Sequence, residues 1–345
     1  MALIFTEGFD AYTSDADAEQ RGWHIESGIG VAISSDYRRG DSGYGVGMNS
    51  SYAFYRYLPT TYTTVYVGFA QLKRQNGTPS PDMSNAWFYV GDESGAHQVQ
   101  LHINADHSIS AWLGDHSTLL GSTAAGVYPT STSQWNYWEV KVTIDNSAGE
   151  VVLRKNEEVV LNLTSQDTKY GSDYIGRLYW RPVYNNIGIS LDDIYVDSSQ
   201  FHGNCVVKTF MPDSDSATHT DFERSGGSFD YECVDEIPPN DDTDYIKSST
   251  VGHISTFGIT TGSLNTVKGI NVKNFARLVG GGTRSIKPIV RSNGADYQGT
   301  EVEVTTGPTY ICEPTAGIWE TDPDDSNAWT QTKLEAAEFG LEITA

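Results

Sequence analysis

The feature that most constrains this chain is an alternation of apolar and polar side chains within residues 135–145, regular from Trp138 to Asp145. A period of two residues is that of a β-strand with one buried and one wet face. The apolar side of such a strand would carry Trp138, Val140, Val142 and Ile144, and the wet side Tyr137, Glu139, Lys141 and Thr143. The pattern predicts an antiparallel sandwich.

Further strands are predicted at 65–72, 86–90, 97–103, 107–113, 151–154 and 159–163, with turn residues between them. Alternation within 97–103 places His97 and His102 on opposite faces of the sheet. We therefore expect the four histidines between 97 and 116 to be solvated or hydrogen-bonded, and not to form a metal cluster.

Residues 187–203 mark the expected end of a first domain. Leu191, Ile194 and Val196 form a short strand, the polar residues 197–200 follow, and Gly203 tolerates a bend. A chain of 345 residues fits two domains of ordinary size. We expect a β-sandwich over residues 1–200, a hinge at 198–203 and a second β-sandwich over 201–345, for attachment or assembly.

Residues 1–197 resemble the laminin-G and concanavalin A-like jelly-roll sandwiches. The resemblance lies in Trp135 at the head of a strand, a glycine turn, a strand–Asn156 turn–strand unit, the polar segment 165–168 and the closing strand 191–196. With it, the expected fold is all-β, with two antiparallel, jelly-roll-like β-sandwich domains. One short helix is expected near the C-terminus, where Thr332 and Glu335 form a capping box and Gly340 follows as the C′ residue.

The charge balance excludes one class of partner. Asp and Glu number 45 against 22 Lys and Arg, for a formal net charge of -23. Nucleic-acid binders need a basic face, so no nucleic acid is expected. The N-terminus lacks the basic region of a signal peptide, and no apolar run approaches the ~20 residues of a membrane span, so no membrane is expected. Three cysteines (Cys205, Cys233, Cys312) suggest buried thiols of a protein made in a reducing cytosol.

Charge is segregated within the second domain. Residues 213–244 are acidic, and the clusters at 213–215 and 241–244 suggest either calcium loops or solvated turns. Neither has the spacing of a known calcium loop, so we favour solvated turns and expect no cofactor.

Residues 245–295 contain no acidic residue. Within this range the sequence predicts a hairpin in which residues 270–278 pair with residues 284–291 and the chain turns at 280–282. Its basic residues either neutralise acidic loops of their own domain or form a docking surface. The candidate docking residues are Lys268, Lys273, Arg277, Arg284, Lys287 and Arg291.

Short pieces of the second domain are similar to structural proteins of tailed bacteriophages. They are 234–236, 243–245, the hairpin 267–291, 322–324, 328–330 and 338–340. The resemblance implies a virion component that is made in the host cytoplasm. We expect a capsid-decorating or tail-attached accessory protein, a homo-oligomer that docks on other virion proteins and on copies of itself. The rival hypothesis is a receptor-binding, lectin-like tail adhesin for a host surface glycan.

Motifs for catalysis were sought as well. The sequence has no Glu-x-Asp-x-Glu strand of β-glucanases, no Gly-x-Ser-x-Gly elbow, no phosphate loop and no His-Glu-x-x-His. We therefore expect no catalytic residues and no enzyme. Aromatic side chains could stack on sugar rings or could simply be core. The sugar-stacking candidates are Trp112, Tyr179, Trp180 and Tyr184.

Overall fold

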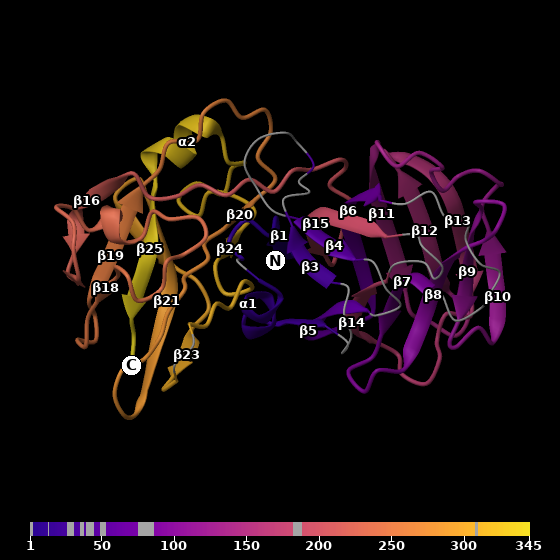
Figure 1. Cartoon of the computed structure of the whole chain (residues 1–345), viewed down its shortest axis with the longest axis horizontal. Helices are drawn as coiled ribbons and strands as arrows, with labels where there is room; N and C mark the ends of the chain where they lie inside the picture. The colour runs from indigo at the N-terminus through magenta and orange to yellow at the C-terminus, as the bar shows by residue number, and fades with distance from the viewer. Residues whose placement is uncertain are drawn as a thin grey trace. The chain divides into compact units, whose positions relative to one another are not determined.

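The computed structural model describes residues 3–12, 14–25, 31–34, 38, 45–48, 53–74, 86–181, 188–307 and 310–345. The chain divides into two compact units, Ile4–Val207 (the first unit) and Lys208–Ala345 (the second unit) (Figure 1). The division falls after Val207, a few residues beyond the expected hinge at 198–203. Whether each unit folds alone stays a prediction.

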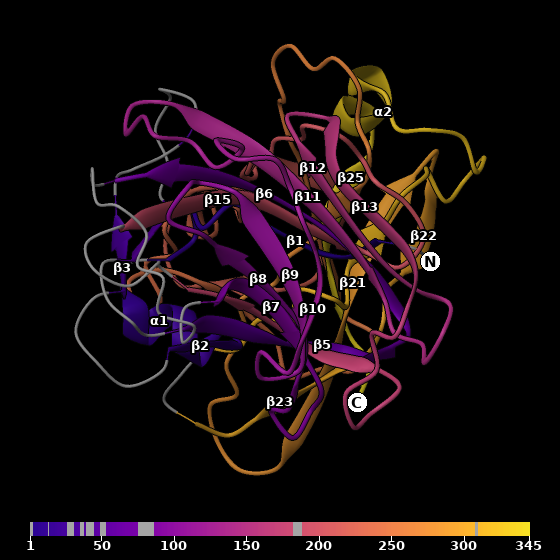
Figure 2. The same cartoon turned by 90° about the vertical axis from the view of Figure 1, so that its right-hand side faces the viewer.

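The first unit contains two antiparallel sheets (Figure 2). The strands of one are β1 (Leu3–Glu7), β3 (Val31–Ser34), β4 (Gly45–Met48), β6 (Thr64–Lys73), β11 (Trp135–Thr143), β12 (Gly149–Lys155), β13 (Glu158–Gln166) and β15 (Ile189–Asp197). This eight-stranded sheet has the order β13-β12-β11-β6-β15-β4-β3, and β1 also pairs with β15.

The second sheet of this unit is seven-stranded. Its members are β2 (Trp23–Ile25), β5 (Phe54–Tyr62), β7 (Ala86–Gly91), β8 (His97–Ile103), β9 (Ile109–Leu113), β10 (Thr118–Ser122) and β14 (Ile175–Trp180). Their order is β10-β9-β8-β7-β14-β5-β2. A short helix that the sequence analysis missed, α1 (Asp15–Gln20), is capped by the Ser14 side chain, which accepts a hydrogen bond from the backbone N–H of Asp17.

Aromatic side chains fill the space between the two sheets. The Trp87 ring of β7 lies edge-on to Trp138 of β11, with centroids 4.9 Å apart, and Trp180 of β14 lies 5.9 Å from Phe69 of β6. All four are completely buried, as expected for Trp138 on the apolar side of 135–145. The opposite side is not uniformly wet. Glu139 is also buried, because the Tyr195 hydroxyl and the backbone N–H of Gly203 both donate to its carboxylate.

The second unit is also built of antiparallel strands. Its six-stranded sheet consists of β16 (Ser214–Thr220), β19 (Ile254–Gly258), β21 (Thr283–Ser292), β22 (Ala295–Gln298), β23 (Val302–Thr305) and β25 (Glu338–Ile343). Two smaller pairs are β17 (Glu223–Arg224) with β18 (Ile246–Lys247), and β20 (Ile270–Asn271) with β24 (Ile318–Trp319). A 3-10 turn, η1, spans Tyr231–Cys233, and α2 spans Gln331–Ala336. The all-β fold class and the short helix near the C-terminus are confirmed.

Two local predictions in this unit are wrong. Residues 270–278 do not pair with 284–291: β20 pairs with β24, while β21 pairs with β25, β22 and β23. The helix is capped by Thr330 and not by Thr332, and Gly340 lies within β25. A Cβ at Gly340 would lie 1.9 Å from the carbonyl oxygen of Ser255, so close strand packing and not a helix end requires this glycine.

Two expectations from the sequence concern the burial of the cysteine thiols and membrane-spanning segments. Cys233 is buried, whereas Cys205 and Cys312 are half-buried. Among the described residues, no helix has both the length and the apolar character that crossing a membrane requires.

Candidate functional site

One row of side chains crosses six strands of the seven-stranded sheet in register. Cα pairing runs from His24 to Tyr55, Tyr179, Tyr89, Gln100 and finally Trp112. These six residues are called the cross-strand row. Successive residues of a strand point to opposite faces, and Trp180 points into the core. Tyr179 and the row therefore lie on the outer face of this sheet.

Four rings of the row stack one on the next. Ring centroids are 4.9 Å apart between His24 and Tyr55, 4.9 Å between Tyr55 and Tyr179, and 4.2 Å between Tyr179 and Tyr89. Tyr179 and Tyr89 are buried, and His24 and Tyr55 are half-buried. Tyr57 lies two residues after Tyr55 in β5, on the same face of the sheet, and is 39% exposed. The aromatic surface thus becomes accessible towards β2 and β5.

His97 joins this face, contrary to the prediction from alternation. The β7–β8 ladder shifts register between Val90, which pairs with Val99, and Gly91, which pairs with His97. The extra residue in β8 reverses the alternation at that point. The Tyr89 ring lies 4.4 Å from the His97 ring, and Nδ1 of His97 lies 2.8 Å from the Asp115 carboxylate. The prediction that His97 and His102 lie on opposite faces is therefore wrong.

Gln100 fixes the state of His102. Its amide nitrogen donates to the carbonyl of Gly114 at 2.7 Å, so its amide oxygen is the acceptor for Nε2–H of His102 at 2.9 Å. Burial lowers the pKa of His102 to about 3, and His116, His97 and Arg181 contribute through their charge. His102 is therefore neutral near pH 7 and serves as a fixed hydrogen-bonding group. The His116 ring packs 3.6 Å from it, centroid to centroid.

Arg177 lies beside the tyrosines of the row. Its Nη1 donates to the Tyr179 hydroxyl at 3.0 Å, its Nη2 donates to the carbonyl of Glu93, and its guanidinium carbon lies 4.3 Å from the centre of the Tyr57 ring. Burial raises the pKa of Tyr179, while Arg177 acts in the opposite direction. The hydroxyl is therefore protonated near neutral pH. Together these groups offer the edges of stacked aromatic rings bordered by hydrogen-bond donors, a surface of mixed polarity suited to a sugar.

The sugar-stacking candidates fall in different places. Tyr179 and Trp112 belong to the cross-strand row, and Trp112 donates through Nε1 to the Ser110 hydroxyl at 2.9 Å. Trp180 is completely buried against Phe88, Phe69 and Trp23, where a ligand cannot reach it. Tyr184 lies outside the described residues. Sequence reasoning did not select His24, Tyr89, Gln100 or Arg177, because only strand register brings them together.

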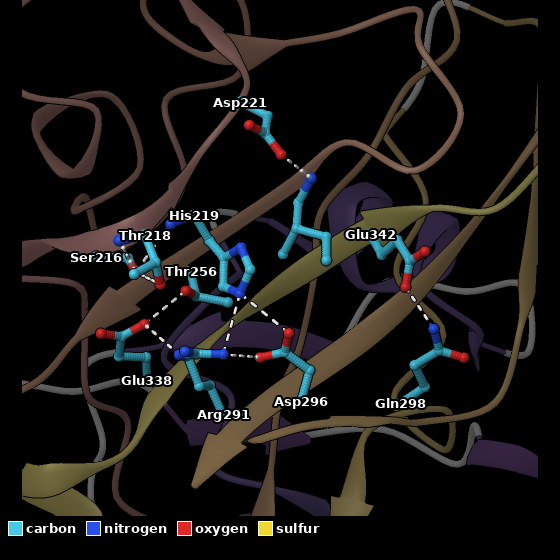
Figure 3. Close-up of polar contacts among 11 residues, drawn as sticks. Ser216, Thr218, His219, Asp221, Thr256, Arg291, Asp296, Gln298, Glu338 and Glu342 are labelled. Carbon is cyan, nitrogen blue, oxygen red and sulfur yellow. Dashed lines mark hydrogen bonds and ion pairs between the residues drawn. The ribbon is translucent and has the colours of Figure 1, made fainter. Parts of the chain in front are cut away.

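The candidate docking residues do not share one hairpin face, and three of them have acidic partners in their own unit. Figure 3 shows Arg291, His219 and Asp296 pointing towards one another, and Arg291 Nη1 lies 2.7 Å from Asp296. Arg277 binds the Asp242 carboxylate through Nη1 at 2.8 Å. Lys287 Nζ lies 4.0 Å from Glu301. These contacts favour charge neutralisation within the unit. Lys268 and Arg284 are exposed, and Lys273 is half-buried.

The acidic clusters that suggested calcium loops use their carboxylates within the protein. Asp215 accepts hydrogen bonds from the backbone N–H groups of Asp230 and Tyr231, at 3.0 and 2.7 Å. Asp244 accepts one from the Asn240 amide, and Asp242 is bound by Arg277. These contacts are those of self-contained turns, and calcium binding stays a prediction.

No family model and no curated protein matches this sequence. Solved structures with a similar fold include an alginate lyase in complex with an alginate trisaccharide (TM-score 0.41, 9% identity, covering 58% of this chain and 99% of that chain). Another is a galectin-like protein of unknown function from Bacillus subtilis (TM-score 0.40, 13% identity, 57% and 96% covered). A third is a carbohydrate esterase from Shiga toxin-encoding bacteriophage phi24B (TM-score 0.37, 13% identity, 57% and 99% covered). At these values the likeness concerns the fold alone.

The comparison contradicts our expectation that the chain is not an enzyme. An alginate lyase and a carbohydrate esterase share this sandwich fold. The expectation failed because it rested on four absent motifs, which sample a few reaction classes and leave out lyases altogether. Their absence does not separate this chain from carbohydrate-active enzymes.

Proposed function

We propose that the outer face of the seven-stranded sheet binds a polysaccharide. The observation that carries the proposal is the cross-strand row, in which aromatic and amide side chains from six strands are aligned by backbone register. Such a row crosses the strands over a length of roughly 24 Å, taking ~4.8 Å for each of its strand spacings. A row of this length matches an extended polymer better than a small molecule.

The competing explanation is that these aromatic side chains only pack against one another. Tyr89 and Tyr179 are buried and do form a small cluster with Ala53 and Ala86. The two ends of the row differ from its centre, because His24, Tyr55 and Trp112 are half-buried. Partly exposed aromatic rings that carry polar groups favour a ligand with both apolar faces and hydroxyl edges.

The test is a glycan array probed with the full chain and with Tyr55→Ala. We expect saturable binding of at least one glycan, and an affinity roughly tenfold weaker in the variant, since a lost ring contact of about 1.4 kcal/mol is a factor of ten. Trp112→Ala should weaken binding as well. Trp180→Ala is unsuitable, because removing a buried tryptophan opens a core cavity.

Tyr66→Ala provides the matched control. Tyr66 is a half-buried tyrosine of β6, in the other sheet, and packs against Phe201 with ring centroids 4.9 Å apart. Its removal should leave glycan binding unchanged. Equal loss in Tyr55→Ala and Tyr66→Ala, or binding to no glycan, would contradict the proposal. A separate incubation of the full chain with a soluble polysaccharide reports any shortening of that polymer.

The virion assignment remains a prediction from short sequence matches. A tail adhesin is the form of it that agrees with glycan binding, and a capsid-decorating accessory protein is the other. Its partners would be virion proteins and copies of this chain. Electron microscopy of intact virus particles, labelled with an antibody against this chain, would decide between head and tail. Particles without label would rule out both positions.

A further inference from the structure

Two arginines flank Tyr179 on the outer face of β14. Arg177 and Arg181 lie two residues before and after it, and alternation places all three side chains on one side of the strand. The backbone N–H of Arg181 donates to the carbonyl of Trp87 at 2.9 Å, so pairing with β7 continues to this residue. The two arginines are therefore about 13 Å apart along the strand, at ~3.3 Å per residue, with the cross-strand row between them.

The positive charge of each arginine lowers the pKa of a histidine on this face. Burial lowers the pKa of His24, and the charges of Arg56 and Arg177 lower it further. Arg181 contributes in the same direction to the low pKa of His102, behind burial and two histidines. Both histidines are thus biased towards the neutral form. Lasting positive charge on this face comes from the arginines.

The described acidic side chains near Arg177 include Glu93, which is exposed to solvent and whose backbone carbonyl accepts from Arg177. Asp115 pairs with His97, and its side chain is 73% exposed, so solvent screens it. Glu19 acts on His24 and is also exposed. In a chain with a formal net charge of -23, a face with two arginines is a local exception. Electrostatic repulsion by the rest of the chain makes such a face the favoured place for an anion to bind.

Arg177 retains a donor for a ligand. Its Nη1 donates to the Tyr179 hydroxyl and its Nη2 to the Glu93 carbonyl. Each of these two nitrogens carries two N–H groups, so each has one donor more than these bonds use. Arginine donors match the oxygens of a carboxylate or sulfate.

We propose that the cross-strand row takes a polysaccharide whose sugars carry anionic groups, and that Arg177 and Arg181 select the negative charge. The proposal rests on the glycan binding proposed above and adds the charge class of the polymer. The aromatic side chains contact the sugars, and the arginines contact carboxylates or sulfates along the chain.

The test compares polymers that differ only in charge, with the full chain. Polygalacturonate is paired with its methyl ester, alginate with its propylene glycol ester, and a sulfated dextran with dextran. We expect at least one anionic member to bind roughly tenfold more tightly than its neutral partner, with a preference that falls as salt is added. Which pair responds distinguishes carboxylate from sulfate.

Arg177→Gln and Arg181→Gln test the residues, and Arg284→Gln, an exposed arginine of the second unit, is the charge-matched control. We expect each of the first two to weaken binding of the anionic polymer severalfold more than binding of its neutral partner. Arg177→Lys should retain part of the preference. If Arg177→Gln weakens both polymers equally, with its melting temperature unchanged, Arg177 only positions Tyr179 and the charge inference is overturned.

Two other outcomes separate this inference from the function on which it rests. Equal affinity for the charged and neutral members of every pair overturns charge selection and leaves glycan binding intact. Binding of no polymer in any pair and of no glycan on the array overturns both.

Discussion

At the scale of single residues, Asp92 shows how one carboxylate supports the candidate site. Burial raises the pKa of Asp92, but hydrogen bonds from Ser172, Ser94 and the backbone of Ala96 outweigh it, and the pKa is lowered overall. These bonds measure 2.6, 2.6 and 2.9 Å. They hold the turn that carries Glu93, whose carbonyl accepts from Arg177.

We predict that Asp92→Asn lowers the free energy of unfolding by about 1–2 kcal/mol at neutral pH, because charge-assisted hydrogen bonds are lost. A carboxylate with a lowered folded-state pKa stabilises the protein above its unfolded pKa, and that contribution is lost as the pH falls through the folded pKa. The difference between wild type and variant should therefore be largest above about pH 5 and shrink in acid. Urea unfolding at several pH values measures it, and a difference independent of pH would contradict the argument.

The sequence could identify single residues of the site and not their arrangement. Tyr179 and Trp112 were selected as aromatic residues that could stack on sugars, and both belong to the cross-strand row. Gln100 and His97 gave no such signal. Gln100 is placed by the pairing of β8 with β7 and β9. His97 is placed by a register shift that the local sequence pattern does not indicate.

At the scale of elements, α2 allows a direct test of where the helix begins. The Thr330 side chain accepts from the backbone N–H of Lys333 at 3.2 Å, which makes it the N-cap. We predict that Thr330→Ala destabilises the protein by about 1 kcal/mol, the usual cost of losing such a cap. Thr332→Ala, at the cap that the sequence suggested, lies inside the helix and should cost nothing, since alanine favours helix. Thermal unfolding of the two variants should separate them, and the reverse order would contradict the assignment.

Strands that are defined by their own alternation were predictable, and strands that are defined by distant partners were not. The 135–145 pattern identified β11 because its buried side chains are local to it. The hairpin expected at 270–291 failed because β25, from the end of the chain, pairs with β21 in its place. Glycines 280–282 looked like a hairpin turn, yet a turn signal fixes only the reversal and not the pairing.

At the scale of the whole molecule, acidic and basic segments that looked like opposed surfaces largely satisfy each other inside the second unit. Arg277 of the basic segment pairs with Asp242 of the acidic segment, and Lys247 with Glu223. Composition could show that charge is segregated along the chain. It could not show that the fold brings these segments together, which depends on strand order.

The last prediction concerns where the first unit ends. Segment 198–207 follows β15, yet its backbone is bound to the first unit. The N–H of His202 donates to the Tyr195 hydroxyl at 3.0 Å, that of Gly203 to Glu139 at 2.8 Å, and that of Val207 to Asp193 at 2.8 Å. Glu139 and Asp193 are buried, so removing these donors leaves buried carboxylates with fewer partners.

We therefore expect a fragment of residues 1–207 to unfold at higher urea than a fragment of residues 1–197. The difference should be at least about 2 kcal/mol, since hydrogen bonds to charged groups contribute roughly 1.5–3 kcal/mol each. Tryptophan fluorescence reports the transition, because Trp87, Trp138 and Trp180 lie in the core between the sheets. A fragment of 1–203 should be intermediate, since it keeps the bond to Glu139 and loses the bond to Asp193. Equal stability of all three fragments would show that the segment 198–207 adds no stability to the first unit, as expected of the hinge that the sequence predicted at 198–203.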